Sequence, residues 1–296
     1  MSVTDFDPLP PRMTPSDRPF IGDGWSLQER DPQTIRQLMP WWEWFYRYYF
    51  RVETQGWDNI PDGRALFVGS HNGGLSSPDM SMMIYDWYRH QGLERPVYGL
   101  MHPTVWKMSY PVAQLAVKVG AIQAHPKMAI AALQSGASVL VYPGGAQDVF
   151  RPFSERHRIH LAGRKGFIKI ALRENVPIVP AIAVGSHETL FVMTDCYEQV
   201  QWLHRLGMPY LLGVDPVVFP IYLGLPWGIA LGPLPHLPLP IKMYTRIGKP
   251  IVFERYGEEA ARDRAYVTAC YRQVESQMQR DLDQLVAETS PDCGLK

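Results

Sequence analysis

The chain has 296 residues, 46% hydrophobic and 20% charged, so it is long and apolar enough to bury a large globular core. Lys+Arg and Asp+Glu both total 29, and this balance gives no global electrostatic reason to expect a nucleic acid as partner. The three cysteines, Cys196, Cys270 and Cys293, have neither the number of a disulfide framework nor the spacing of a metal site, which favours a reducing compartment.

The N-terminal segment divides into a proline-rich lead-in, residues 1–31, and a predicted helix, residues 32–54. The lead-in lacks the apolar stretch of a secretory signal. Asp31-Pro32 is a typical helix start, because the carboxylate caps free amides and proline suits the first helical position.

The predicted helix is unusually aromatic over residues 38–52, LMPWWEWFYRYYFRV. Its charged residues, Glu43, Arg47 and Arg51, are four apart and form one narrow polar stripe, so aromatic rings cover the remaining surface. Because Trp and Tyr favour the lipid headgroup zone, we predict an amphipathic helix lying in a membrane interface. A helix sandwiched in the core remains the alternative.

The segment from Pro216 to Ile241 is apolar and free of Asp, Glu, Lys and Arg, but it contains seven prolines. A helix interrupted so often cannot keep its hydrogen bonds in lipid, so no membrane-spanning helix is expected. We predict an irregular apolar excursion that faces a membrane together with the aromatic helix.

Strand and helix patterns alternate from residue 64 onward. Short apolar strands are predicted over residues 64–70, 96–102, 137–142 and 176–185, with helices over 127–135 and 163–175. A long C-terminal helix carries an apolar face formed by Val267, Tyr271, Val274, Met278, Leu282 and Leu285. This alternation predicts an α/β fold, a central mixed, mostly parallel sheet flanked by helices, in one domain over residues 55–290 with a tail over 291–296.

The turn that leaves the first predicted strand carries the strongest chemical signal, Ser70-His71-Asn72-Gly73-Gly74-Leu75-Ser76-Ser77-Pro78-Asp79. Ligands of α/β sheets bind outside the carboxyl ends of the strands, where His71 stands. An imidazole accepts a proton near neutral pH, and a carboxylate such as Asp79 orients it. The amides at Asn72, Gly73 and Gly74 are candidates for facing an anion. The plain alternative is a loop histidine and a helix-capping aspartate.

Three ordered blocks, residues 52–74, 119–152 and 163–189, resemble the glycerolipid acyltransferase superfamily, which includes lysophosphatidate acyltransferase. The Tyr-Pro-Gly-Gly and Arg-Lys-Gly-Phe blocks are most similar to its monoacylglycerol and diacylglycerol acyltransferase-like branch. The resemblance implies transfer of an acyl group to a lipid hydroxyl. We expect no metal and no bound cofactor, and the mechanism needs no covalent acyl-enzyme. The expected donor is an acyl thioester, either acyl coenzyme A or an acylated acyl carrier protein.

The first block of that superfamily is His-x4-Asp, in which the histidine is the base and the aspartate orients it. The resemblance therefore assigns the base role to His71. Here the first acid after it is Asp79, eight residues on, and we expect the turn from Gly73 to Pro78 to bring this acid back towards the imidazole.

The third block of the superfamily, commonly Glu-Gly-Thr-Arg, is represented here by Pro143-Gly144-Gly145-Ala146-Gln147-Asp148. In members of the superfamily with phosphate-headed acceptors, the glutamate and the adjacent arginine are expected to help hold the glycerol phosphate. This chain lacks both residues, which favours a neutral lipid alcohol as acceptor. Tyr142, Pro143, Gly144 and Gly145 are predicted to line the acceptor pocket or an oxyanion site. A simple turn at the end of a strand is the alternative.

Arg164 and Lys165 stand at a predicted helix start, where positive charge opposes the helix dipole unless an anion binds there. They are candidates for the phosphates of a coenzyme A donor, and a solvated basic turn is the alternative. Neither the His157/His160 pair nor His187-Glu188 has the companions that a zinc site needs.

These observations predict a membrane-associated O-acyltransferase on the cytoplasmic face of a membrane, peripheral or monotopic. Two alternatives remain open. One is a lipid esterase or thioesterase in which water replaces the alcohol, and the other is a non-catalytic lipid-binding protein of the same fold. The sequence does not indicate the acceptor's identity or the oligomeric state.

Overall fold

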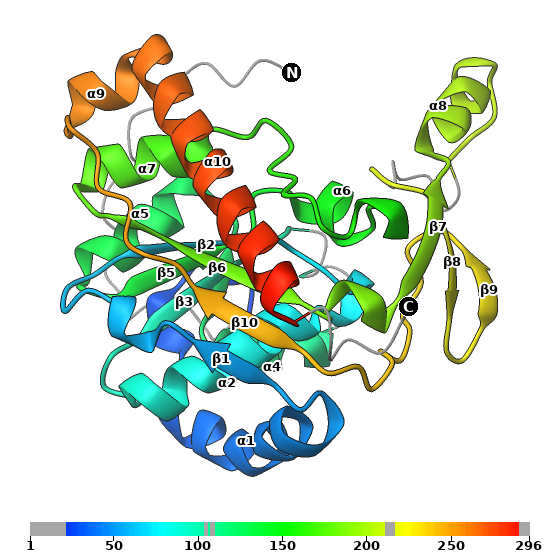
Figure 1. The fold of residues 1–296 in the computed structure, drawn as a ribbon, viewed down its shortest axis with the longest axis horizontal. Coiled ribbons are helices and arrows are strands. Elements are labelled where there is room, and N and C mark those ends of the chain that lie inside the picture. Colours follow the sequence, from blue (N-terminus) through cyan, green and yellow to red (C-terminus); the bar gives the residue numbers. More distant parts are fainter. Residues whose placement is uncertain (1–21, 104–105, 107–109, 211–216, 290–296) are drawn as a thin grey trace.

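The structure, a computed structural model, describes residues 22–103, 106, 110–210 and 217–289. A seven-stranded sheet at its centre has the strand order β1-β10-β6-β2-β5-β3-β4 (Figure 1). The strands of this sheet are β1 (Glu53–Gln55), β2 (Leu66–Gly69), β3 (Val97–Met101), β4 (Ala121–Gln123), β5 (Ser138–Val141), β6 (Ile178–Val184) and β10 (Tyr244–Ile247).

The pairing in this sheet is mixed and mostly parallel. Strands β6, β2, β5, β3 and β4 run parallel, β10 is antiparallel to β6, and β1 is parallel to β10. Strand β2 therefore lies in the middle, between β6 and β5, with apolar layers on both sides. The predicted α/β fold class is confirmed.

Helices cover both faces of the sheet. The helices are α1 (Pro32–Trp44), α2 (Pro78–Gln91), α4 (Tyr110–Lys118), α5 (Pro126–Gln134), α7 (Gly166–Glu174), α9 (Glu258–Arg262) and α10 (Arg264–Thr289). Helices α5, α7, α9 and α10 build the core on one face, and α1 and α2 build a second core on the other. Within β2, Leu66 and Val68 join the first core whereas Phe67 joins the second, as the alternation of strand side chains requires.

Helix α10 crosses the sheet diagonally, as Figure 1 shows, and packs on β6 and β10. All six residues of its predicted apolar face are buried, with exposed fractions of 7% or less. This burial confirms the predicted packing role of the helix.

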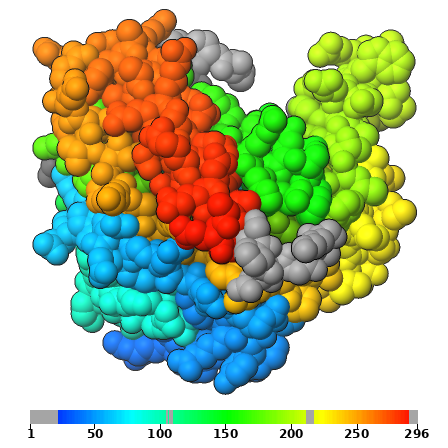
Figure 2. Space-filling model, viewed as in Figure 1, coloured from blue at the N-terminus to red at the C-terminus, as the bar shows by residue number. Residues whose placement is uncertain are grey.

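A second, three-stranded antiparallel sheet stands beside the main body (Figures 1 and 2). It consists of β7 (Phe191–Asp195), β8 (Pro220–Gly224) and β9 (Gly228–Leu231), and the short helix α8 (Tyr197–Arg205) follows β7. The prediction that Pro216–Ile241 is irregular is therefore wrong for the two stretches that form β8 and β9. Pro220 starts β8, Pro226 lies in the turn between β8 and β9, and the remaining described prolines follow β9, so a missing amide costs little at each position. Residue 216 lies outside the described part.

The aromatic N-terminal segment is divided between core and surface. Helix α1 continues as a π-helical turn, Phe45–Tyr49, which buries Tyr46 and then Phe50 against α2. The exposed rings follow at helical spacing and form what we call the aromatic stripe: Trp41, Trp44, Phe45 and Tyr48, with exposed fractions of 70%, 49%, 37% and 66%. Among the described residues, no helix combines the length and the apolar composition that crossing a bilayer requires.

Candidate active site

The candidate site lies where the central strand β2 ends. The strand stops at Gly69, and His71 follows on a turn that leads into α2. This turn needs glycine at two positions, because Gly73 and Gly74 have φ of +77° and +63° and an added Cβ at Gly74 would lie 2.4 Å from the ring of His236. Ser77, with φ +43°, closes the turn before Pro78 starts α2.

The turn returns Asp79 to His71, as expected. The Nδ1 of His71 lies 3.1 Å from Oδ2 of Asp79, and the same oxygen accepts a hydrogen bond of 3.0 Å from the amide of Asn72. The carboxylate is 4% exposed, so few water molecules compete for it. Asp79 therefore favours the imidazole tautomer that carries its proton on Nδ1.

In this tautomer the other ring nitrogen of His71, Nε2, carries a lone pair. It lies 3.3 Å from the hydroxyl of Ser77, which is also 3.1 Å from the carbonyl oxygen of Gly74, so the single hydrogen of that hydroxyl is donated to one of the two acceptors at a time. A proton acceptor, oriented from behind by a carboxylate, results at the end of the central strand.

Burial and charge act in opposite directions on His71. Burial lowers the pKa of the imidazole, but the adjacent Asp79 carboxylate, aided by Asp148, raises it by more, so the net pKa is raised from 6.5. The ring also stacks on Tyr142, with ring centroids 4.5 Å apart and planes 29° apart. Burial raises the pKa of that phenol well above 10, so Tyr142 stays neutral beside the imidazole.

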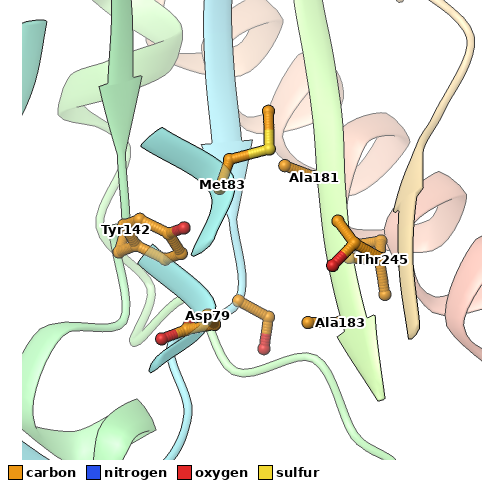
Figure 3. A pocket seen from close by; sticks show the side chains of 8 residues that line it. Asp79, Met83, Tyr142, Ala181, Ala183 and Thr245 are labelled. Carbon is orange, nitrogen blue, oxygen red and sulfur yellow. The ribbon is translucent and has the colours of Figure 1, made fainter. Parts of the chain in front are cut away.

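Asp79 and Tyr142 line a small cavity, and no basic side chain is among the residues that line it (Figure 3). Tyr142, from the end of β5, and Thr245, from β10, face it, and Met83 and Ala181 form apolar wall. Apolar surroundings strengthen the attraction between Asp79 and a protonated His71, because the effective dielectric constant is low.

The third block forms the start of α6 (Gly145–Val149). The amide of Gly145 donates to the carbonyl of Tyr142 at 3.2 Å, so only the amide of Gly144 remains of the two predicted oxyanion donors. The turn around Pro143 directs the Gly145 amide to a backbone carbonyl. The residue types alone do not predict this hydrogen bond.

The basic pair Arg164 and Lys165 precedes α7, and both side chains already have protein partners. Arg164 donates to the carbonyls of Pro143 and Gly144 at 2.6 and 2.8 Å, so it braces the third block. Lys165 donates to the hydroxyl of Thr268 at 2.9 Å. The predicted contact of this pair with donor phosphates remains a prediction.

Sequence reasoning missed two groups of residues that surround the turn. Asp148 and Arg151, 0% and 3% exposed, contact His71 directly, although only their spacing after a buried strand could have suggested this. His236 contacts Gly73 through Nε2 at 3.1 Å, and Ser76 donates to the carbonyl of His236 at 2.8 Å. No local pattern in the sequence predicts that the segment around His236 contacts this turn.

A solved structure shares the architecture of this chain. The 1-acyl-sn-glycerophosphate acyltransferase PlsC from Thermotoga maritima aligns with a TM-score of 0.50 and 15% identity, covering 86% of this chain and 80% of that one. At this identity the likeness concerns the fold, which agrees with the predicted α/β class.

Sequence comparison is more specific. A Mycobacterium tuberculosis protein of uncharacterized function is 32% identical over 252 residues, and 2-acylglycerol O-acyltransferase 3 of Homo sapiens is 25% identical over 167 residues. The aligned regions cover 84% and 55% of this chain, but 66% and 44% of those proteins. The chain thus spans about two thirds of the length of its mycobacterial relative. The family described as diacylglycerol acyltransferase matches residues 29–279, and the chain therefore belongs to this family.

Proposed function

We propose that the chain transfers a fatty acyl group from an acyl thioester to the hydroxyl group of a neutral lipid, with His71 as general base. The observation that carries this proposal is the bond between His71 and Asp79, which leaves Nε2 as a proton acceptor. Membership of the diacylglycerol acyltransferase family supports the reaction class.

In this mechanism the acceptor hydroxyl gives its proton to Nε2 of His71 while its oxygen attacks the thioester carbonyl carbon. The tetrahedral intermediate then expels the thiolate, which takes the proton from the imidazolium, so the products are an ester and a free thiol. Asp79 stabilises the imidazolium between the two steps. The amides of Gly73, Gly74 and Gly144 are candidates for stabilising the oxyanion.

A neutral acceptor fits the third block better than a phosphorylated one. Arg151 hydrogen-bonds to the turn. Each of its three nitrogens donates to protein oxygen atoms: Nε to Glu155, Nη1 to His71 and Asp148, and Nη2 to Asn72 and Arg156. Its side chain is 3% exposed. A guanidinium with all of its N–H groups engaged does not bind a phosphate without breaking these bonds.

Two exposed apolar surfaces suit a lipid-borne acceptor. One is the aromatic stripe on α1. The other is the outer face of the second sheet, where Phe191, Leu223 and Ile229 are adjacent across three strands and are 41%, 50% and 71% exposed. We propose that both contact a membrane surface, because apolar patches of this kind are unfavourable in water.

Purified protein should be incubated with acyl coenzyme A and vesicles that contain or lack diacylglycerol. We expect an acylated lipid that forms only with the acceptor present. His71→Asn should lose turnover by a factor of about 100 or more, since general base catalysis contributes roughly that much. His157→Asn, at a half-exposed histidine that lies outside the turn, should retain turnover.

The alternatives give different products. Free fatty acid that forms at the same rate with and without acceptor would identify a hydrolase. Acyl carrier protein thioesters should be tested as donors in parallel, since the turn geometry does not distinguish them. Bound lipid without turnover from either donor would identify a non-catalytic binding protein and would refute the proposal.

A further inference from the structure

A buried ion pair contacts the turn that carries His71, residues 70–79, which we call the catalytic turn. Asp148, on α6, is 0% exposed, and Arg151, which follows α6, is 3% exposed. Nη1 of Arg151 lies 2.5 Å from Oδ1 of Asp148. The two residues are more than 75 positions from His71 in the chain, so only the tertiary fold brings them to the turn.

The pair holds the main chain on both sides of the His71 side chain. Oδ2 of Asp148 accepts a hydrogen bond from the amide of His71, and Nη1 of Arg151 donates to the carbonyl of His71 at 3.0 Å. Nη2 of Arg151 also donates to the side chain of Asn72. Strand β2 ends at Gly69, so strand pairing no longer supplies partners for these backbone groups.

We infer that Asp148 and Arg151 are positioning residues for His71. They fix the backbone from which the imidazole projects, so that Nδ1 stays on Asp79 while the ring stays on Tyr142. The spacing of eight residues between His71 and Asp79 makes this bracing necessary, because the turn between them is long and contains two glycines. This inference rests on the proposed function of His71 and concerns the same site.

The electrostatics of Asp148 favour positioning over simple stabilisation. Burial raises the pKa of its carboxyl group to about 6, although Arg151 and the amide of His71 oppose this change. At neutral pH the carboxyl group is therefore ionised, and its ionisation lowers the free energy of unfolding. Since buried ion pairs are often no better for stability than apolar replacements, the contacts with the turn account better for the pair.

The decisive test compares Asp148→Asn with the double variant Asp148→Asn/Arg151→Met in the full chain. The single variant leaves the Arg151 charge buried without its partner, so its Tm should fall clearly. The double variant removes both charges, so its Tm should recover in part, although the oxygen atoms that accept from Arg151 lose their donor. We expect kcat nonetheless to stay about 100-fold low, with little change in KM, because misplaced catalytic groups cost this much.

A merely structural ion pair predicts the opposite result. In that case kcat would recover together with Tm in the double variant, and the inference would be overturned. Asp86→Asn is the matched control, because Asp86 is a buried carboxylate paired with Arg89 at the same i,i+3 spacing but lies on α2 away from the turn. It should lower Tm and leave kcat unchanged.

A second measurement does not depend on turnover. The charged or titratable groups that face His71 are Asp79, Asp148, Arg151 and Tyr142. NMR titration of isotope-labelled histidine gives the pKa of His71, whose resonance is identified with His71→Asn. In the double variant the removed charges act on the pKa of His71 in opposite directions, with Asp148 the stronger, so a small fall is expected from their removal alone. A fall as large as that in Asp79→Asn reports loss of the Asp79 contact, as we expect. A smaller fall or an unchanged pKa would refute positioning.

This titration also separates the two proposals. If the unmodified protein transfers no acyl group, the proposed function fails, while the pKa of His71 still tests the positioning role. If the double variant does not fold, Asn72→Ala provides a milder test, because it removes one bond to Arg151 and one to the carbonyl of Ser70 but leaves the ion pair intact. It should lower kcat by about 10-fold, and an unchanged kcat would count against the inference.

Discussion

At the scale of the residue, the proposed role of His71 as general base links catalysis to folding with opposite signs. Its pKa is raised in the folded protein, so protonated His71 contributes stability that is fully present below about pH 6.5. That contribution is lost as the pH rises through the folded pKa. Catalysis requires the unprotonated base, so turnover should rise over the same interval.

Asp79→Asn should move this rise to lower pH. The change keeps the size of the side chain but removes the charge that raises the pKa of His71. It also removes the preference for the catalytic tautomer, so kcat should fall by about 100-fold or more. Profiles of kcat/KM against pH for both proteins test this prediction, and identical profiles would show that Asp79 does not act on the base.

Gly74→Ala should lower the free energy of unfolding by more than alanine does at another glycine with positive φ. Its φ is +63°, and a Cβ there would lie 2.4 Å from Cε1 of His236, so backbone strain and a clash add together. Gly136, with φ +89°, has open space around the same position and isolates the strain. Alanine should cost about 1–3 kcal/mol of unfolding free energy at Gly136 and more at Gly74, as measured by denaturant unfolding. Equal costs would contradict the proposed contact.

At the scale of the element, α10 stabilises the sheet from one side. Met278 is 0% exposed in the core that α10 shares with the sheet, so Met278→Ala leaves a cavity. We expect a loss of about 2–5 kcal/mol in unfolding free energy. Arg272→Ala, on the exposed side of the same helix, should change it by less than about 0.5 kcal/mol. Equal effects of the two variants would indicate that the helix packs differently.

At the scale of the whole molecule, the two apolar surfaces are connected. The hydroxyl of Tyr49, beside the aromatic stripe, donates to the carbonyl of Pro238 at 2.7 Å, and Arg51 donates to the carbonyl of Pro240 at 2.7 Å. The segment that leaves β9 thus bonds to the end of the aromatic helix. It also contacts the turn that carries His71 through His236, so a membrane bound at the two proposed surfaces would lie against elements that hold this turn.

Charge placed on the second sheet should weaken membrane binding. Ile229→Glu/Leu231→Glu introduces two carboxylates at positions 71% and 57% exposed, where folding should tolerate them but lipid should not. Flotation with vesicles should show a large loss of bound protein. Val252→Glu, at a 67% exposed position outside both surfaces, is the control. Undiminished flotation of the double variant would exclude the sheet as a membrane contact.

The sequence by itself determined the alternation of strands and helices and the place of His71. Apolar runs such as residues 137–142 are short and bounded by Gly and Pro, and the apolar face of α10 repeats with the helical period, so local periodicity was sufficient. Strands β1 and β4 have three residues each, too few to show a period. The family resemblance added the role of the base.

Only the tertiary structure decided what surrounds His71. Asp79 returns because Gly73, Gly74 and Ser77 adopt left-handed conformations, and Asp148 arrives from a segment 77 positions away. The pairing of β8 with β7 depends likewise on partners distant in the chain. Side chains report their local preference, whereas contacts across such separations depend on how the elements pack, and that packing built the site around one imidazole.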